Sequence, residues 1–193
     1  MYDILKFLHI MGFVFMSVPL FNLIVVNERV LLGPKFIYSV DRYMENLIKG
    51  GAKRCFVFQS TVLVTGVLLL VYGPLGIGAL WQNWVMLAKT LILFTLMGLL
   101  SYVHFQIQPK IEALLAGLNA DSAVPESLMD KLKPCRMLRK KLATFCLFLV
   151  ITAIILGMQV YNTFHPLLTL VLIALAGLFA ARVNKTLIRF GWL

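Results

Sequence analysis

Five long stretches of apolar residues, separated by shorter polar stretches, dominate the pattern of the chain. A helix needs roughly 20 mostly apolar residues to cross the hydrocarbon core of a bilayer, and each stretch is close to that length. The pattern therefore predicts an all-α polytopic membrane protein, a bundle of about five transmembrane helices that forms a single membrane domain over residues 1–193. The predicted spans are residues 2–26, 55–72, 81–105, 142–161 and 166–181.

The basic residues are divided unevenly among the segments between the predicted spans. All lysines and arginines except Lys6 and Lys89 lie in residues 27–54, in residues 106–141 or in the C-terminal tail. The other two connections, GPLGIGAL and NTFHP, contain neither residue type. Because Lys and Arg collect on the cytoplasmic side of membrane proteins, we expect the N-terminus outside and the C-terminus inside.

The composition also indicates a membrane protein, and it affects how the positive net charge is interpreted. The chain is 61% hydrophobic and has a mean hydropathy of +0.90, whereas a soluble domain is about half apolar. A net charge of +10 would suggest a nucleic-acid partner for a soluble protein. Here the charge follows from the topology and from contact with anionic lipids of the inner leaflet, so we expect no nucleic-acid partner.

Ionisable side chains inside the predicted spans are the candidates for function, because they are costly to place in lipid. Counted from the outer edge, His9, Gly66 and Lys89 all lie roughly 10 to 12 Å deep, in one layer of the bundle. His104 lies roughly 22 Å further towards the inside than Lys89. We therefore expect that His9 and His104 do not ligate the same iron.

Two interpretations of His9 remain open. As a haem ligand, it would have Gly12 one turn away to leave room for a flat macrocycle, and Met16 further along the same face to pack on a porphyrin edge. As a structural residue, it would hydrogen-bond a neighbouring helix, and Gly12 would allow close helix packing. Lys89 would pair with a propionate, act as a neutral amine or snorkel outward, and Trp84 would line the outer pocket.

The remaining polar residues allow several roles. His104, near the inner boundary, is a metal-ligand candidate whose alternative is a capping or headgroup contact. His165, in the last outer turn, is a metal-ligand candidate whose alternative is a solvated turn residue. Asn22, Gln59 and Gln159 are expected to hydrogen-bond between helices, and residues 119–126 to form a polar inner loop. The three cysteines show no C-x-x-C or zinc spacing and should be reduced. No Walker, HExxH or Ser-His-Asp constellation is found.

Three stretches of the chain resemble a known group of small integral membrane proteins, the CopD/HemJ-like group, which includes a related uncharacterised family. They are LKFLHIMG at the start, VLVTGVLLLVYG in the second predicted span and WQNWVMLAKTLILF at the start of the third. The resemblance implies a b-type haem or porphyrin site, with His9 as the first-helix histidine and Lys89 as the lysine that follows a tryptophan. HemJ-type members oxidise protoporphyrinogen IX, and CopD-type members are linked to copper uptake.

The residues and the resemblance together lead to three hypotheses. The first is a haem-b protein of the bacterial cytoplasmic (inner) membrane, with a role in electron transfer or porphyrin redox chemistry, alone or as a subunit of a larger membrane complex. The second is a non-redox accessory subunit of a membrane complex, with structural histidines. The third is a HemJ-like oxidase or a copper-handling protein that uses methionines and His9. Whether the protein is an enzyme stays open.

Overall fold

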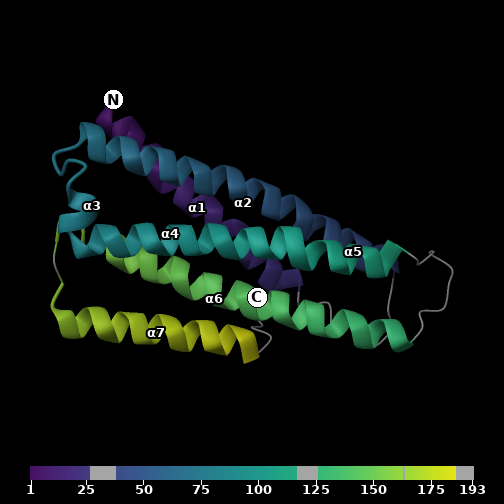
Figure 1. The fold of residues 1–193 in the computed structure, drawn as a ribbon. Helices are drawn as coiled ribbons and strands as arrows, with labels where there is room; N and C mark the ends of the chain where they lie inside the picture. The colour runs from purple at the N-terminus through teal and green to yellow at the C-terminus, as the bar shows by residue number, and fades with distance from the viewer. Residues whose placement is uncertain (27–37, 117–125, 163, 186–193) are drawn as a thin grey trace, which may run out of the picture.

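The computed structural model describes residues 1–26, 38–116, 126–162 and 164–185, which are mostly helical and contain no strand (Figure 1). The elements are α1 (Tyr2–Val26), α2 (Tyr38–Tyr72), α3 (Ala79–Gln82), α4 (Trp84–Tyr102), the π-helical segment η2 (Val103–Ile107), α5 (Gln108–Ala116), α6 (Glu126–Met158) and α7 (Pro166–Lys185). Five stretches are long and apolar enough to cross a membrane: Tyr2–Phe21, Tyr38–Tyr72, Trp84–Ala116, Leu128–Met158 and Pro166–Asn184. The prediction of an all-α polytopic membrane protein is confirmed.

Two of the spanning helices are much longer than the hydropathy pattern predicted. Helix α2 begins at Tyr38 instead of residue 55, and α6 begins at Glu126 instead of residue 142. At about 1.5 Å per residue, the 35 residues of α2 extend over roughly 50 Å, whereas the hydrocarbon core is roughly 30 Å thick. Much of the two polar segments therefore continues the spans as helix. The loop expected over residues 119–126 falls almost entirely outside the described residues, as does the side chain of Asn22.

The third predicted span is interrupted near both of its ends. Asn83 has an extended backbone, and its Oδ1 accepts a hydrogen bond of 2.9 Å from the N–H of Val85, so it caps the start of α4. The turn before α3 contains Gly76 at a φ of +68°, a conformation that costs little only for glycine. At the inner end, η2 separates α4 from α5.

The long helices lie side by side, and their ends gather at two opposite ends of the bundle (Figure 1). The start of α1, the connection from α2 to α4 and the connection from α6 to α7 lie at one end of the bundle, on the left of the view. The starts of α2 and α6 and the end of α5 lie at the other end. That second end carries the described basic residues near the start of α2, in α5 and in the first half of α6, which is the grouping that an N-out, C-in orientation requires.

Two clusters of buried apolar side chains hold the helices together. The first lies in the middle of the bundle and consists of Met16, Cys55, Leu96, Cys146, Leu149 and Val150. The second lies at the inner end and consists of Ile107, Ile111, Leu115 and Leu132. Where the inner cluster extends beyond the hydrocarbon, each fully buried side chain stabilises the fold by about 1.5–3 kcal/mol through the hydrophobic effect. Within the lipid that driving force is absent, so close packing and polar contacts determine how the helices associate.

Candidate functional site

His9 lies against α2, where Thr65 forms a hydrogen bond with its ring and Gly66 leaves room for it. Its Nδ1 lies 3.0 Å from Oγ1 of Thr65. A Cβ atom added to the neighbouring Gly66 would lie 3.2 Å from Cε1 of the ring, which is tighter than an ordinary contact. A side chain at residue 66 would therefore press on the imidazole, which lies against α2 beside this glycine. The prediction that His9 and Gly66 lie in one layer of the bundle is confirmed.

The hydrogen bonds of Thr65 determine which ring nitrogen of His9 carries the proton. Oγ1 of Thr65 lies 2.6 Å from the carbonyl oxygen of Thr61, which can only accept. A hydroxyl has a single proton to donate, so Thr65 donates to Thr61 and accepts from Nδ1–H of His9. In the neutral imidazole, Nε2 then keeps its lone pair. This is the usual arrangement of a metal-ligating histidine, whose other ring nitrogen donates to a fixed acceptor.

Lys89 extends from α4 into the space between the helices. Its Nζ would lie 3.7 Å from a Cβ atom on Gly157, in the last turn of α6, so the side chain runs towards the outer end of the bundle. The ammonium is close enough to interact electrostatically with His9. Among the described residues, no side chain or carbonyl forms a hydrogen bond or ion pair with Lys89. A lysine charge within the hydrocarbon is costly, so this position favours an anion as its partner.

Three other residues predicted for this site have different surroundings. A Cβ atom on Gly12 would lie 3.1 Å from Cγ2 of Val62 and 3.4 Å from Cγ2 of Thr61, so the space beside Gly12 is filled by α2. Met16 is buried in the central cluster. Trp84 is exposed at the outer end of α4, a depth that tryptophan prefers in membrane proteins. The surroundings of these three residues are therefore helix α2, the central cluster and the outer end of α4.

His104 is far from His9 along the bundle axis. It lies in η2, and its ring centroid is 5.7 Å from that of Phe56. His9 contacts Gly66, ten residues further along the same helix, which corresponds to about 15 Å. The expectation that the two histidines cannot ligate one iron is confirmed. Nδ1 of His104 is buried and has no hydrogen-bond partner within the described part of the chain.

Other predicted polar residues fasten helix ends. Nδ1 of His165 accepts a hydrogen bond of 3.3 Å from the N–H of Leu167, at the start of α7. Oε1 of Gln159 accepts a hydrogen bond of 3.1 Å from the hydroxyl of Thr169, so the expected bond between helices is confirmed for Gln159. For Gln59 the expected bond is not found. Its side-chain oxygen is buried and has no hydrogen-bond partner within the part of the chain that the structure describes.

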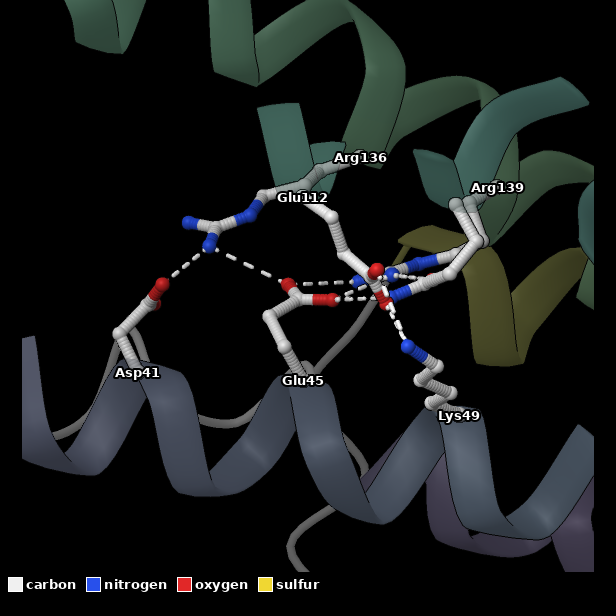
Figure 2. A network of polar contacts seen from close by, with 7 residues as sticks. Asp41, Glu45, Lys49, Glu112, Arg136 and Arg139 are labelled. Carbon is white, nitrogen blue, oxygen red and sulfur yellow. Dashed lines mark hydrogen bonds and ion pairs between the residues drawn. The ribbon is translucent and has the colours of Figure 1, made fainter. Parts of the chain in front are cut away.

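A network of ion pairs at the inner end was missed by the sequence analysis (Figure 2). Arg139 of α6 donates to both carboxylate oxygens of Glu45 on α2, at 2.6 and 3.0 Å. The same guanidinium donates to Oε1 of Gln108 on α5 at 2.8 Å. Arg139 is 1% exposed and Glu45 2% exposed. The network therefore fastens three helices to one another through buried charges.

Three more ion pairs extend this network. Arg136 pairs with Asp41 and, at 3.2 Å, with Glu45. Lys49 and Glu112 form a more exposed pair at 3.0 Å. In the sequence, the acidic residues of α2 are four apart and the arginines of α6 are three apart, so each pair lies on one helical face. That spacing is the signal that was available, but the basic residues were interpreted only as markers of topology.

Comparison with known proteins adds no assignment, because no protein-family model, curated protein or solved structure matches the chain. Within the described residues, no group of three or more His, Cys, Asp or Glu side chains is placed to hold a metal ion. The resemblance to the CopD/HemJ-like group therefore stays a prediction. Over the described residues, the fold defines an integral membrane protein with five helices long and apolar enough to span a membrane, and with Lys89 within electrostatic range of His9.

Proposed function

We propose that the chain is an integral membrane protein that binds b-type haem, or a related porphyrin, through His9 and has a redox or electron-transfer role. The proposal places it in the bacterial cytoplasmic membrane, alone or as a subunit of a larger complex, and a CopD/HemJ-like relationship would agree with it. The observation that carries it is the hydrogen bond from His9 to Thr65. That bond fixes the ring and leaves Nε2 able to ligate iron.

Lys89 supplies the second property that such a group needs. A haem carries negatively charged propionates, and Lys89 offers a cation that lacks an acidic partner among the described residues and lies within electrostatic range of His9. A charge pair in a low-dielectric environment is stronger than in water. When bound, haem would supply one-electron chemistry whose potential depends on its axial ligands and its burial. Thr65 would orient His9, and Lys89 would hold a propionate near the outer end.

The packing around His9 limits where a porphyrin fits. Helix α2 closes one side of the ring at Gly66 and also fills the position beside Gly12. The donor chemistry of His9 and Lys89 therefore fits the group, but the room that Gly12 and Gly66 suggested is occupied by helix contacts. A porphyrin bound by this chain must lie on the side of His9 that faces away from α2.

The same contacts favour a second candidate, a non-redox accessory subunit of a membrane complex. In that function, Gly12 and Gly66 would serve only to bring α1 and α2 together, and the hydrogen bond from His9 to Thr65 would be one of the polar contacts that hold membrane helices in register. The two candidates differ in one measurable property, which is bound pigment.

The experiment that tests the proposal is a reduced-minus-oxidised absorption spectrum of the detergent-purified chain with a pyridine haemochrome assay. We expect a b-type spectrum at about one haem per chain, lost in His9→Ala and kept in His165→Ala, whose side chain only caps α7. A chain that is colourless as purified and does not bind added haemin would contradict the proposal. A colourless chain that co-purifies with a membrane complex would support the accessory subunit instead.

A further inference from the structure

A partly open cavity of about 80 Å³ lies between α1, α2, α4 and α6. It is separate from the site proposed for haem, because neither His9 nor Lys89 lines it. Pockets for organic ligands and cofactors begin at about 300 Å³, so this cavity is too small for them. Its size suits two or three water molecules, at roughly 30 Å³ each, or a single ion with its ligands.

Three sulfur-containing residues from three helices line this cavity. Met16 of α1, Cys55 of α2 and Cys146 of α6 all line it, all are buried and all belong to one cluster. The two thiols are close enough to interact electrostatically. The hydrogen of the Cys55 thiol is directed at the carbonyl oxygen of Met16, with an S···O distance of 3.6 Å. The lone pairs of that sulfur therefore remain available to a ligand.

Gln59 gives an independent indication that the cavity takes a ligand. It lines the cavity one helical turn outward from Cys55 and is 3% exposed. Its Oε1 has no hydrogen-bond partner within the described residues. A buried polar atom without a partner is unfavourable, and native proteins usually satisfy such an atom with water, an ion or another group.

We propose that this cavity binds one soft metal ion, of which Cu(I) is the biological example, between Cys55, Cys146 and Met16. Thiolate and thioether sulfur select such ions over hard cations, and metal–sulfur bonds of about 2.3 Å are compatible with a cavity of this size. This inference goes beyond the proposed haem function and does not depend on it.

Charge balance favours a monovalent ion in these surroundings. Cu(I) bonds to one thiol sulfur, and the proton of that thiol leaves to water, so the total charge of the cavity stays at zero. The second thiol and the thioether donate lone pairs without losing a proton, and the ion keeps its oxidation state. Arg139, at the inner end of the cavity, is already paired with Glu45. A divalent ion would need both thiols to lose their protons before the cavity was neutral, and a hydrated ion would bring uncompensated charge into apolar surroundings at a high cost.

The test titrates the whole reduced chain in detergent, under anaerobic conditions, with Cu(I) held by a coloured chelator whose loss of colour reports transfer. We expect one Cu(I) per chain and a sulfur-to-copper absorption band in the near ultraviolet. Cys55→Ser and Cys146→Ser should each weaken binding at least about tenfold, since loss of a residue that only orients a metal ligand already costs 10- to 100-fold. Cys55→Ala and Cys146→Ala serve as second variants where a serine variant does not elute as a single species.

The controls separate this site from the rest of the molecule. Cys135 packs against the inner cluster instead of lining the cavity, so Cys135→Ser should bind as the wild type does. His9→Ala should also bind Cu(I) normally, including in a chain that holds no haem. The proposal is overturned if the wild type binds no Cu(I), if both cavity variants bind as tightly as the wild type, or if His9→Ala abolishes binding.

Discussion

Arg139 and Glu45 form a bidentate ion pair, with N···O distances of 2.6 and 3.0 Å, that is almost completely buried although the two residues are 94 positions apart in the chain. Removing one member of such a pair leaves the other charge buried and uncompensated, which costs about 3–5 kcal/mol. We expect Glu45→Ala to lower the stability of the folded chain by about that amount. Thermal unfolding of the purified protein in detergent, followed by circular dichroism, would measure it.

The matched control is the exposed ion pair of the same network. The side chains of Lys49 and Glu112 are 43% and 34% exposed, and exposed pairs contribute about 0–1 kcal/mol. Glu112→Ala should therefore change the unfolding temperature little. Equal losses of stability in Glu45→Ala and Glu112→Ala would show that the buried pair does not fasten the three helices.

Thr65 should control metal binding by His9 without touching the metal. Thr65→Val keeps the shape of the side chain and removes the acceptor for Nδ1–H. If His9 ligates haem, we expect the affinity for haemin to fall about 10- to 100-fold, the usual effect of losing the partner of a ligating histidine. Titration with haemin, followed in the Soret band, measures this change.

A second threonine separates this effect from a general one. Thr95 of α4 is exposed and its hydroxyl donates only to the carbonyl of Leu91 in its own helix, at 2.8 Å. Thr95→Val should bind haemin as the wild type does. If Thr65→Val also binds as the wild type does, the hydrogen bond to His9 has no part in ligation.

Gly66 and Gly98 should respond in opposite ways to the addition of a methyl group. A Cβ atom on Gly66 meets the ring of His9 at 3.2 Å, whereas one on Gly98 meets nothing within 4 Å. We expect Gly66→Ala to destabilise the fold by about 1–3 kcal/mol through overpacking. Gly98→Ala should be neutral or stabilising by up to about 1 kcal/mol, since alanine is the better helix residue. Thermal unfolding of the two variants tests this, and a stabilised Gly66→Ala would contradict the contact.

The orientation in the membrane predicts which exposed positions a membrane-impermeant thiol reagent can reach in intact cells. Asn162 lies between α6 and α7, and Lys133 lies in the first part of α6; both are exposed. In a cysteine-free background, Asn162→Cys should be labelled from outside, and Lys133→Cys only after the membrane is made permeable. The reverse pattern would invert the topology that the basic residues indicate.

The spans could be predicted from the sequence because the thickness of the bilayer imposes a length on every apolar helix. The first span was predicted as residues 2–26, and α1 has those bounds. The inner parts of α2 and α6 gave no such signal, because a charged helix outside the lipid has no hydropathy signature. They are helical in the fold because Glu45, Arg139 and the inner apolar cluster meet there, and these contacts join residues distant in the chain.

The candidate site was predictable in depth but not in its contacts. The constant rise of a helix was enough to place His9 and Gly66 in one layer. The rotation of α1 about its axis decides whether Gly12 faces α2 or a free space, and a helix that is apolar on all sides does not encode that rotation in its pattern. For the same reason, the sequence did not reveal that Thr65 accepts from His9 or that Met16 faces the two cysteines.

The buried charges also set an order of events for a chain that is made from one end. Asp41 and Glu45 are synthesised about 95 residues before the arginines that pair with them. Until α6 emerges, those two carboxylates lack the arginines that balance their charge in the folded chain, and burying them without those arginines would be costly. The first three spans can therefore enter the bilayer while their inner ends remain apart. Burial of Glu45 is then a late step of biogenesis, reached only by a chain that has been translated past residue 139.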